Sequence, residues 1–211
     1  MNKINAVLLA GGESSRFGSD KALLSFAGMT LIEYIYKNLD ENFSQVIIVG
    51  SKDKYSFVKG AEIREDIYQD RGPLGGIYTG LYYSDNTYNF ICGCDMPFLN
   101  RCYFDFLKKE KSENPTAEII VPRFKGYLEP LAAIYNRSLL EKIRQELLND
   151  NLKIKSFYSK SSKKIVKDKL LKQNLNLDLD RLFFNLNYPE DKEKAVNYLM
   201  EGADQIAKAE K

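Results

Sequence analysis

The 211-residue chain contains no histidine, and this absence excludes more chemistry than any other feature of its composition. Without an imidazole, neither Ser-His nor Cys-His catalysis is available, and a histidine-bound metal centre cannot form. Phosphoryl and nucleotidyl transfer remain open, because substrate positioning, fixed cations and Mg²⁺ do most of the work in those reactions.

Cysteine is scarce and its spacing is uninformative for metal binding. The chain has an odd number of cysteines, Cys92, Cys94 and Cys102, and no two of them have the CxxC spacing. On a strand, Cys92 and Cys94 would point to the same face. We therefore expect reduced thiols in the core.

The net charge is small, and long apolar runs are absent. A formal charge of +2 lacks the basic excess that sequence-independent binding of nucleic acid needs. No apolar run reaches the length of a membrane span, and the N-terminal run is soon followed by charged residues, unlike a signal peptide. We expect a cytoplasmic enzyme with small-molecule partners, binding neither nucleic acid nor membrane.

The overall composition suits one globular domain. Of the residues, 44% are apolar and 28% are charged, and no internal repeat or Pro/Gly/Ser-rich linker divides the chain. We expect a single domain over residues 1–211, with about residues 201–211 as a C-terminal tail.

Apolar periodicity predicts alternating strands and helices. The predicted strands are 4–10, 45–50, 88–94, 118–122, 128–135 and 182–186. The predicted helices are 30–40, 74–84, 101–112, 138–149 and 190–200. Thr30 and Glu33 have the capping-box spacing at the start of the first helix. This alternation is typical of a doubly wound, mainly parallel α/β sheet.

The most informative segment is LLAGGESSRFGSDK, from Leu8 to Lys21. Gly11 and Gly12 follow a predicted buried strand, where α/β sheets bind ligands, and Arg16 and Lys21 can supply charge to several phosphates. The segment matches neither a Walker A loop nor the dinucleotide fingerprint, because its glycines have the wrong spacing. A triphosphate loop is favoured over a glycine-rich turn with two solvated cations.

Other candidate groups follow later strands. Asp95 comes just after strand 88–94, where it could bind Mg²⁺ or cap the next helix. Residues 72–76, GPLGG, open a helix with glycines that permit close backbone approach to a nucleotide. Upstream, Asp66 and Asp70 could accept hydrogen bonds from ribose or base, and Asp66 is preferred.

Two further regions remain open between a functional and a structural role. Asn185 and Asn187 could face the same cleft, or one of them could cap the helix after Pro189. The lysines of residues 151–180 could form a solvated face or a basic rim for an anionic substrate.

Five segments in order resemble the MobA-type molybdenum cofactor guanylyltransferases. They are LAGGESSRFGSDKALLSFAG at the N-terminus, GPLGGI at 72–77, CDMPFL at 94–99, EPLAAIY at 129–135 and NLNYPED at 185–191. The first motif is shared with sugar-phosphate and cytidylyl-transferring relatives, whereas the combination is more specific. The resemblance implies a three-layer, Rossmann-like nucleotidyltransferase fold over about residues 4–200.

The resemblance also implies roles for individual residues. Leu9, Ala10, Gly11, Gly12 and Lys21 would contact GTP, with Arg16 facing its triphosphate. Asp66 would reach the nucleoside, and Asp95 would bind both nucleotide and Mg²⁺. The catalytic residues would be Arg16, Lys21 and Asp95, and Asn185 and Asn187 would face the acceptor.

Two positions depart from the family pattern. Where relatives can place an asparagine after the second strand to contact nucleotide, this chain has Gly50-Ser51, so that contact would move to Ser51. Tyr188 stands where threonine is common, which alters the helix start but retains both asparagines.

The implied reaction is transfer of GMP from GTP to molybdenum-loaded molybdopterin, with Mg²⁺ as cofactor and molybdenum-cofactor delivery proteins or molybdoenzymes as further partners. Two alternatives stay open on the residues alone. One is another Mg²⁺-dependent nucleotidyltransferase, using CTP or a sugar phosphate. The other is a GTP-binding module without turnover.

Overall fold

A computed structural model describes the backbone of residues 3–11 and 20–209, and the side chains of these residues up to Met200. The strands are β1 (Ile4–Leu9), β2 (Ser25–Phe26), β3 (Met29–Thr30), β4 (Val46–Val49), β5 (Glu62–Arg64), β6 (Tyr88–Gly93), β7 (Ile119–Phe124), β8 (Tyr127–Leu128), β9 (Ala132–Asn136) and β10 (Lys163–Val166). The α-helices are α1 (Leu31–Asp40), α2 (Lys52–Tyr55), α3 (Gly72–Tyr83), α4 (Arg101–Glu113), α5 (Leu140–Leu148), α6 (Asp168–Asn174), α7 (Leu179–Leu182) and α8 (Asp191–Ala209). Three 3₁₀ turns are η1 (Lys21–Leu23), η2 (Arg137–Leu139) and η3 (Ser156–Lys160).

The main sheet is mixed, with most of its pairings parallel. Its order is β10-β7-β9-β6-β1-β4-β5, and β8 pairs with β7. The pairs β1–β4, β1–β6, β4–β5 and β7–β10 are parallel. Only β9 reverses direction within the main path, because it lies antiparallel between β6 and β7. The carboxyl ends of β1 and β6 therefore meet at one edge, as an α/β ligand site requires.

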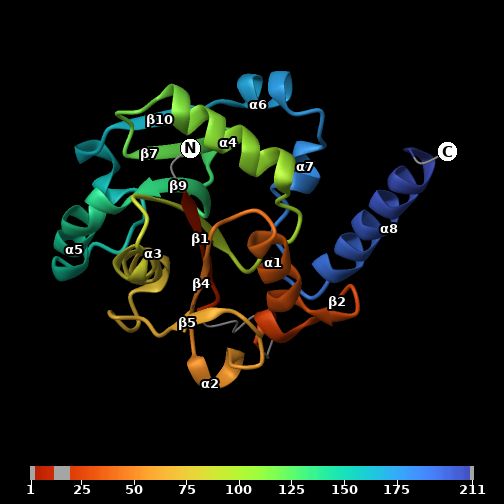
Figure 1. The fold of residues 1–211 in the computed structure, drawn as a ribbon, viewed down its shortest axis with the longest axis horizontal. Helices are drawn as coiled ribbons and strands as arrows, with labels where there is room; N and C mark the ends of the chain where they lie inside the picture. Colours follow the sequence, from red (N-terminus) through yellow and green to blue (C-terminus); the bar gives the residue numbers. More distant parts are fainter. Residues whose placement is uncertain (1–2, 12–19, 210–211) are drawn as a thin grey trace.

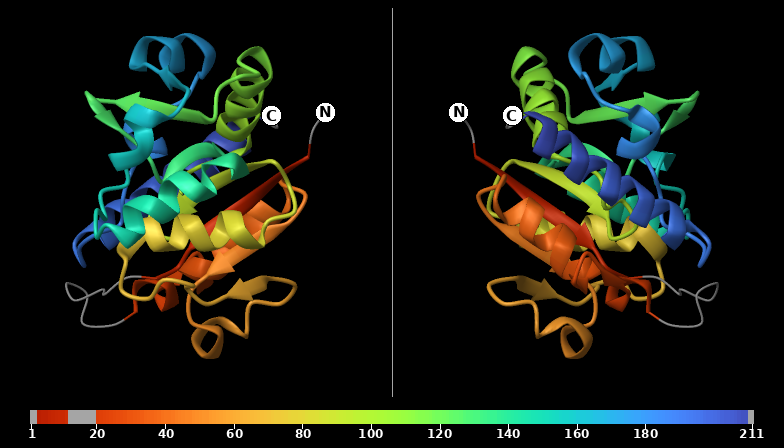
Figure 2. Two further views of the ribbon diagram at one scale, coloured as in Figure 1. Left: turned by 90° about the vertical axis from the view of Figure 1, so that its left-hand side faces the viewer. Right: turned by 90° about the vertical axis from the view of Figure 1, so that its right-hand side faces the viewer.

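Helices cover both faces of this sheet, which gives three layers. Figure 2 shows α3 and α5 in front of the sheet from one side, and α1 and α8 in front of it from the other. Alternate residues of β1 feed the two cores: Ala6 and Leu8 pack with α1 and α4, whereas Val7 and Leu9 pack with α3 and α5. The expected three-layer α/β fold with a mainly parallel sheet is confirmed.

Several predicted helix starts are confirmed in detail. The Thr30 hydroxyl accepts a hydrogen bond from the Glu33 N–H, while the Glu33 carboxylate accepts one from the Thr30 N–H, so the capping box caps α1. Pro73 lies in the first turn of α3, where its missing N–H costs nothing.

The predicted strand at 182–186 is wrong. Residues up to Leu182 form α7, and the chain then runs irregularly to α8. The apolar side chains that suggested a strand pack against helices and loops instead: the Phe183 ring meets Tyr103 at 5.5 Å, and the Phe184 ring meets Phe98 at 5.9 Å. The segment predicted as one strand at 128–135 is also divided, since β8 ends at Leu128 and β9 begins at Ala132.

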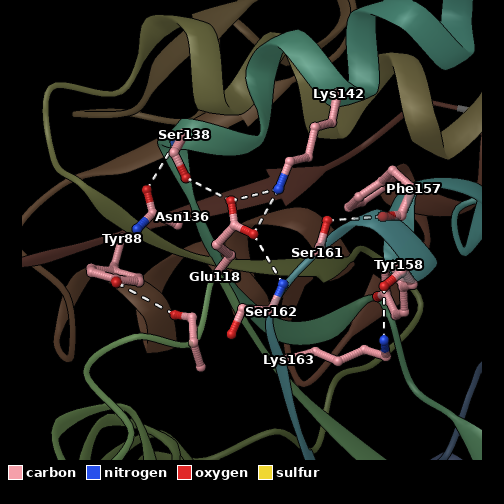
Figure 3. Close-up of polar contacts among 11 residues, drawn as sticks. Tyr88, Glu118, Asn136, Ser138, Lys142, Phe157, Tyr158, Ser161, Ser162 and Lys163 are labelled. Carbon is pink, nitrogen blue, oxygen red and sulfur yellow. Dashed lines mark hydrogen bonds and ion pairs between the residues drawn. The ribbon is translucent and has the colours of Figure 1, made fainter.

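A charged cluster fastens the β10 edge of the sheet to α5 (Figure 3). Glu118, just before β7, accepts hydrogen bonds from the Lys142 ammonium at 2.7 Å, the Ser138 hydroxyl and the Ser162 N–H. Burial raises the pKa of Glu118, but the bonds from Lys142, Ser162 and Ser138 outweigh burial and hold it below its usual range. The cluster ties three elements to the start of β7.

Among the helices that the structure describes, none is both long enough and apolar enough to span a membrane. The first half of α8 packs against the molecule through Ala195 and Tyr198. The helix continues to Ala209, and its C-terminal end extends away from the other elements (Figure 1).

Candidate active site

A pocket of about 180 Å³ lies at the carboxyl ends of β1 and β6. Leu9 is paired with Gly93 in the sheet, and the Cys94 N–H donates to the Leu9 carbonyl at 3.0 Å, so the segments that follow both strands start side by side. The pocket is lined by Leu9, Ala10, Gly11, Asp20, Lys21, Ala22, Pro73, Gly93, Cys94, Asp95 and Leu131. Most residues predicted for the nucleotide site are therefore neighbours.

Three polar side chains meet at this pocket from distant parts of the chain. The Lys21 ammonium lies 3.5 Å from the Asp95 Oδ2 and 3.3 Å from the Asn187 Oδ1. The side chains of Lys21 and Asp95 keep 17% and 22% of their surface exposed, which leaves the cluster accessible to a ligand. We call Lys21, Asp95 and Asn187 the Lys21 cluster.

Asp95 is held in place by its backbone and by a glycine. Its carbonyl accepts a hydrogen bond from the Leu186 N–H at 2.8 Å. A Cβ at position 93 would lie 2.5 Å from the Asp95 Oδ1, so only glycine leaves room for this carboxylate. Asn100 caps α4, through a bond from the Tyr103 N–H. Asp95 is thus not the helix cap, and its carboxylate is available to a ligand.

Asp66 lies beside the glycine turn after β1. A Cβ at Gly11 would be 3.6 Å from the Asp66 Oδ2, and a Cβ at Gly75 would be 3.8 Å from its Oδ1. Burial raises the pKa of Asp66, and the hydrogen bond from the Thr79 hydroxyl offsets part of that rise. The carboxylate thus carries a desolvation cost that hydrogen-bond donors from a ligand would relieve.

The two candidate asparagines differ in their contacts. Asn187 joins the Lys21 cluster through its side-chain oxygen, whereas the Asn185 amide donates to the nearby Phe183 carbonyl at 3.0 Å. Within the described residues, neither asparagine side chain caps a helix, and the Asp191 carboxylate instead accepts hydrogen bonds from the Asn187 and Tyr188 N–H groups. Asn187 is the one that the fold brings to Lys21 and Asp95.

Some expectations stay open or change. Gly12 and Arg16 lie outside the described residues. The Ser51 hydroxyl accepts from the Lys54 N–H and caps α2, and Ser51 does not line the pocket.

Among the cysteines, Cys92 is buried, Cys94 is half-buried and Cys102 is exposed, so the expectation of a core position is wrong for Cys102.

Glu129 is a residue near the site that the sequence did not single out. Its half-buried carboxyl has a raised pKa because of burial, with Lys155 opposing and Asp95 adding to the rise. The signal was present in the segment EPLAAIY, where a carboxylate precedes a proline just before an apolar strand. Because Glu129 is far from Asp95 in the sequence, the sequence alone did not show that the two carboxyl groups influence each other.

Three lysines of residues 151–180 have different surroundings. Lys155 acts on the Glu129 carboxyl near the pocket. In contrast, Lys160 pairs with Glu146 at 2.9 Å, and Lys164 lies 3.5 Å from Glu110. These two contacts tie the segment to α5 and α4.

A larger cavity, about 1150 Å³, lies between α1, the segment after β6 and the α6–α7 region. It is lined by none of the residues predicted for nucleotide binding. We place the chemistry at the smaller pocket, because glycines, a lysine and a carboxylate meet there.

The oxygen donors of the Lys21 cluster fit a hard divalent cation. Asp95 Oδ2 and Asn187 Oδ1 both contact one ammonium, so two oxygens already converge on a position that holds positive charge. Within the described ranges, no group of three or more His, Cys, Asp or Glu side chains forms a ready-made metal site. A metal here would share its coordination with substrate phosphates, as Mg²⁺ commonly does.

Glycines and charged groups at the carboxyl ends of two parallel strands are typical of nucleotide-binding α/β enzymes. Comparison with known proteins identifies the family within this class. The family model described as "MobA-like NTP transferase domain" matches residues 6–165. The chain belongs to this family and is a nucleotidyltransferase.

Relatives and a solved structure agree with that assignment. The chain is 33% identical to a probable molybdenum cofactor guanylyltransferase of Clostridium perfringens, covering 93% of this chain and 98% of that protein. It is 34% identical to one of Natranaerobius thermophilus, covering 94% and 97%. The crystal structure of molybdopterin-guanine dinucleotide biosynthesis protein A from Archaeoglobus fulgidus has the same fold, with a TM-score of 0.82, 23% identity and coverage of 94% and 100%.

Proposed function

We propose that this protein transfers GMP from GTP to the terminal phosphate of molybdenum-loaded molybdopterin, forming molybdopterin guanine dinucleotide and releasing pyrophosphate. The observation that carries the proposal is likeness over nearly the whole length to proteins named molybdenum cofactor guanylyltransferases. The protein would act in the cytoplasm and pass its product to molybdenum-cofactor delivery proteins or molybdoenzymes.

The reaction needs no protein base, which suits a chain without histidine. An oxygen of the acceptor phosphate attacks the α-phosphorus of GTP, and the bond from that phosphorus to the bridging oxygen of the β-phosphate breaks. Pyrophosphate leaves with the electron pair. Lys21 and Arg16 offset the charge that develops on this leaving group.

The other site residues bind and orient the nucleotide. The backbone of Leu9, Ala10, Gly11 and Gly12 would contact the phosphates, and Asp66 would accept hydrogen bonds from the nucleoside. Asn187 would hold a phosphate oxygen or its metal, and Asn185 would lie toward the acceptor.

Mg²⁺ would be held by Asp95, with Asn187 as a further oxygen donor. When bound, it would neutralise phosphate charge and favour pyrophosphate as a leaving group. For that binding, Lys21 must leave its contact with Asp95 and turn toward the triphosphate.

The proposal is tested by supplying the purified protein with each of the four ribonucleoside triphosphates, Mg²⁺ and metal-loaded molybdopterin. We expect pyrophosphate release and dinucleotide formation with GTP, and much less with CTP, ATP or UTP. A site that hydrogen-bonds one base edge leaves polar groups unpaired with another base, which disfavours the wrong nucleotide.

Each alternative gives a different result in the same assay. A preference for CTP would assign the protein to cytidylyl transfer. Product from a sugar 1-phosphate would favour sugar-nucleotide synthesis. Binding of GTP with Mg²⁺ but no pyrophosphate with any acceptor would indicate a binding module, and would overturn the proposed reaction.

A further inference from the structure

Tyr55, the last residue of α2, contacts the backbone of Ala10, which lines the pocket. The residue is 2% exposed. Its hydroxyl lies 2.6 Å from the Ala10 carbonyl and 3.0 Å from the Asp20 Oδ2. The single hydroxyl hydrogen is shared between these two acceptors, which lie before and after the segment that carries Gly12 and Arg16.

A glycine makes this approach possible. A Cβ at Gly50 would lie 2.8 Å from the Tyr55 Cε2 and 3.4 Å from the Ala10 carbonyl carbon. The absence of a side chain at Gly50 lets the aromatic ring lie against the end of β1. Ser51 starts α2 as its N-cap, and this single turn brings Tyr55 back over Gly50.

At the Ala10 end, the hydroxyl fixes a peptide plane. The Ala10 carbonyl and the Gly11 N–H belong to one planar trans peptide and point in opposite directions. Within residues 3–11 and 20–209, the Gly11 N–H has no hydrogen-bond partner. Holding the Ala10 carbonyl therefore also fixes the orientation of the Gly11 N–H, at a residue that lines the pocket.

At the Asp20 end, the same hydroxyl acts on the position of Lys21. The other carboxylate oxygen of Asp20 accepts from the Ala22 N–H at 3.1 Å and caps η1, whose first residue is Lys21. Lys54 adds a contact to Asp20 at 3.3 Å. Burial, and then the charge of Asp20, raise the pKa of Tyr55, so the phenol stays a neutral donor throughout the physiological range.

We propose that Tyr55 is a positioning residue for the nucleoside triphosphate. Its single hydroxyl sets the orientation of the Ala10–Gly11 peptide and, through Asp20, the place of Lys21. The inference rests on the proposed nucleotidyl transfer but not on the choice of base, because Tyr55 acts on groups that meet phosphates. Tyr55 itself touches no substrate.

The test compares Tyr55→Phe with Tyr88→Phe. Both substitutions remove one hydroxyl from a buried tyrosine and keep the ring. The Tyr88 hydroxyl lies 3.3 Å from the Pro115 carbonyl. Tyr88 is the first residue of β6, at the opposite end of that strand from Gly93, which lines the pocket. A third variant, Gly50→Ala, keeps the Tyr55 hydroxyl but pushes its ring.

The measurements are the dissociation constant of the triphosphate that the wild type binds most tightly, the KM values for triphosphate and acceptor, and the melting temperature. For Tyr55→Phe we expect triphosphate affinity to fall about threefold to tenfold, from the loss of one hydroxyl hydrogen shared between two acceptors. The KM for the acceptor should be unchanged. Tyr88→Phe should lose stability only, and Gly50→Ala should resemble Tyr55→Phe.

A Tyr55→Phe protein with wild-type triphosphate affinity and a lowered melting temperature would overturn the positioning role. If Gly50→Ala fails to fold, Tyr55→Phe still decides. A wild type that prefers CTP would contradict the proposed base but leave this comparison intact, using CTP. A wild type that binds no triphosphate would overturn the proposed function and this inference, and would be seen before any variant is made.

Discussion

Replacing Lys21 with alanine should change metal binding and nucleotide binding in opposite directions. The Lys21 ammonium contacts the Asp95 and Asn187 oxygens at 3.5 Å and 3.3 Å. It thus stands where a divalent cation would find its oxygen donors. Before the nucleotide binds, Lys21 competes with the metal for the Asp95 and Asn187 oxygens. Once the nucleotide is bound, Lys21 contacts its phosphates and helps to hold it.

The size of each effect follows from the geometry. Two unit charges about 4 Å apart attract by roughly 4 kcal/mol at an effective dielectric constant near 20. Partial exposure and screening reduce the benefit of such a pair to about 1 kcal/mol, so metal affinity should rise about fivefold in Lys21→Ala. Loss of a charge-assisted bond to the triphosphate costs about 1.5–3 kcal/mol, so turnover should fall roughly tenfold to a hundredfold.

The assay is a titration with Mn²⁺, followed by electron paramagnetic resonance of the free ion, first without and then with GTP. Lys125→Ala is the matched control, since Lys125 also pairs with an aspartate, Asp180, but is 63% exposed and lies outside the pocket lining. Lys125→Ala should leave both the Mn²⁺ affinity and the turnover unchanged. Unchanged metal affinity together with full turnover in a folded Lys21→Ala protein would refute the reasoning.

Three further substitutions test the structure. Asp95→Asn should weaken Mg²⁺ dependence and turnover together, with little change in melting temperature, because Asn100 caps α4; a wild-type Mg²⁺ titration would contradict the metal role. Asp66→Asn should lower GTP affinity yet slightly raise the melting temperature at pH 7, since a carboxyl whose folded pKa is raised loses stability as pH rises through that pKa. Lys142→Met should lower the melting temperature by about 2–4 °C at pH 7 and less at pH 3, because the lowered pKa of Glu118 stabilises the fold above its unfolded pKa and that benefit disappears in acid. An equal loss at both pH values would contradict this origin.

Local signals predicted the parts of the fold that depend on neighbouring residues. The capping box at Thr30 and the carboxylate after β6 are both visible within a few letters of sequence. Apolar periodicity identifies long, regular segments well, so four strands and four helices were predicted close to their observed positions. For α8 only the start was predicted, because the helix continues to Ala209 and not to residue 200.

Features that depend on tertiary contacts were missed. β10 (Lys163–Val166) escaped prediction because it is a short edge strand whose lysines obscure its pattern. Phe183 and Phe184 suggested a strand, but they fill space beside α4 and α8. Tyr55 gave no signal, because its partners at Ala10 and Asp20 lie 45 and 35 residues away.

The order in which β9 enters the sheet has a consequence for synthesis on the ribosome. β6 is flanked by β1 on one side and by β9 on the other, so its second edge stays unpaired until residue 136 has emerged. An open, apolar strand edge invites pairing with other chains, and fragments that end before β9 should therefore aggregate. The contact of Lys21 with Asn187 spans 166 residues and can form only after the sheet is complete. Nascent chains would therefore lack the complete Lys21 cluster until almost the entire sequence has been made.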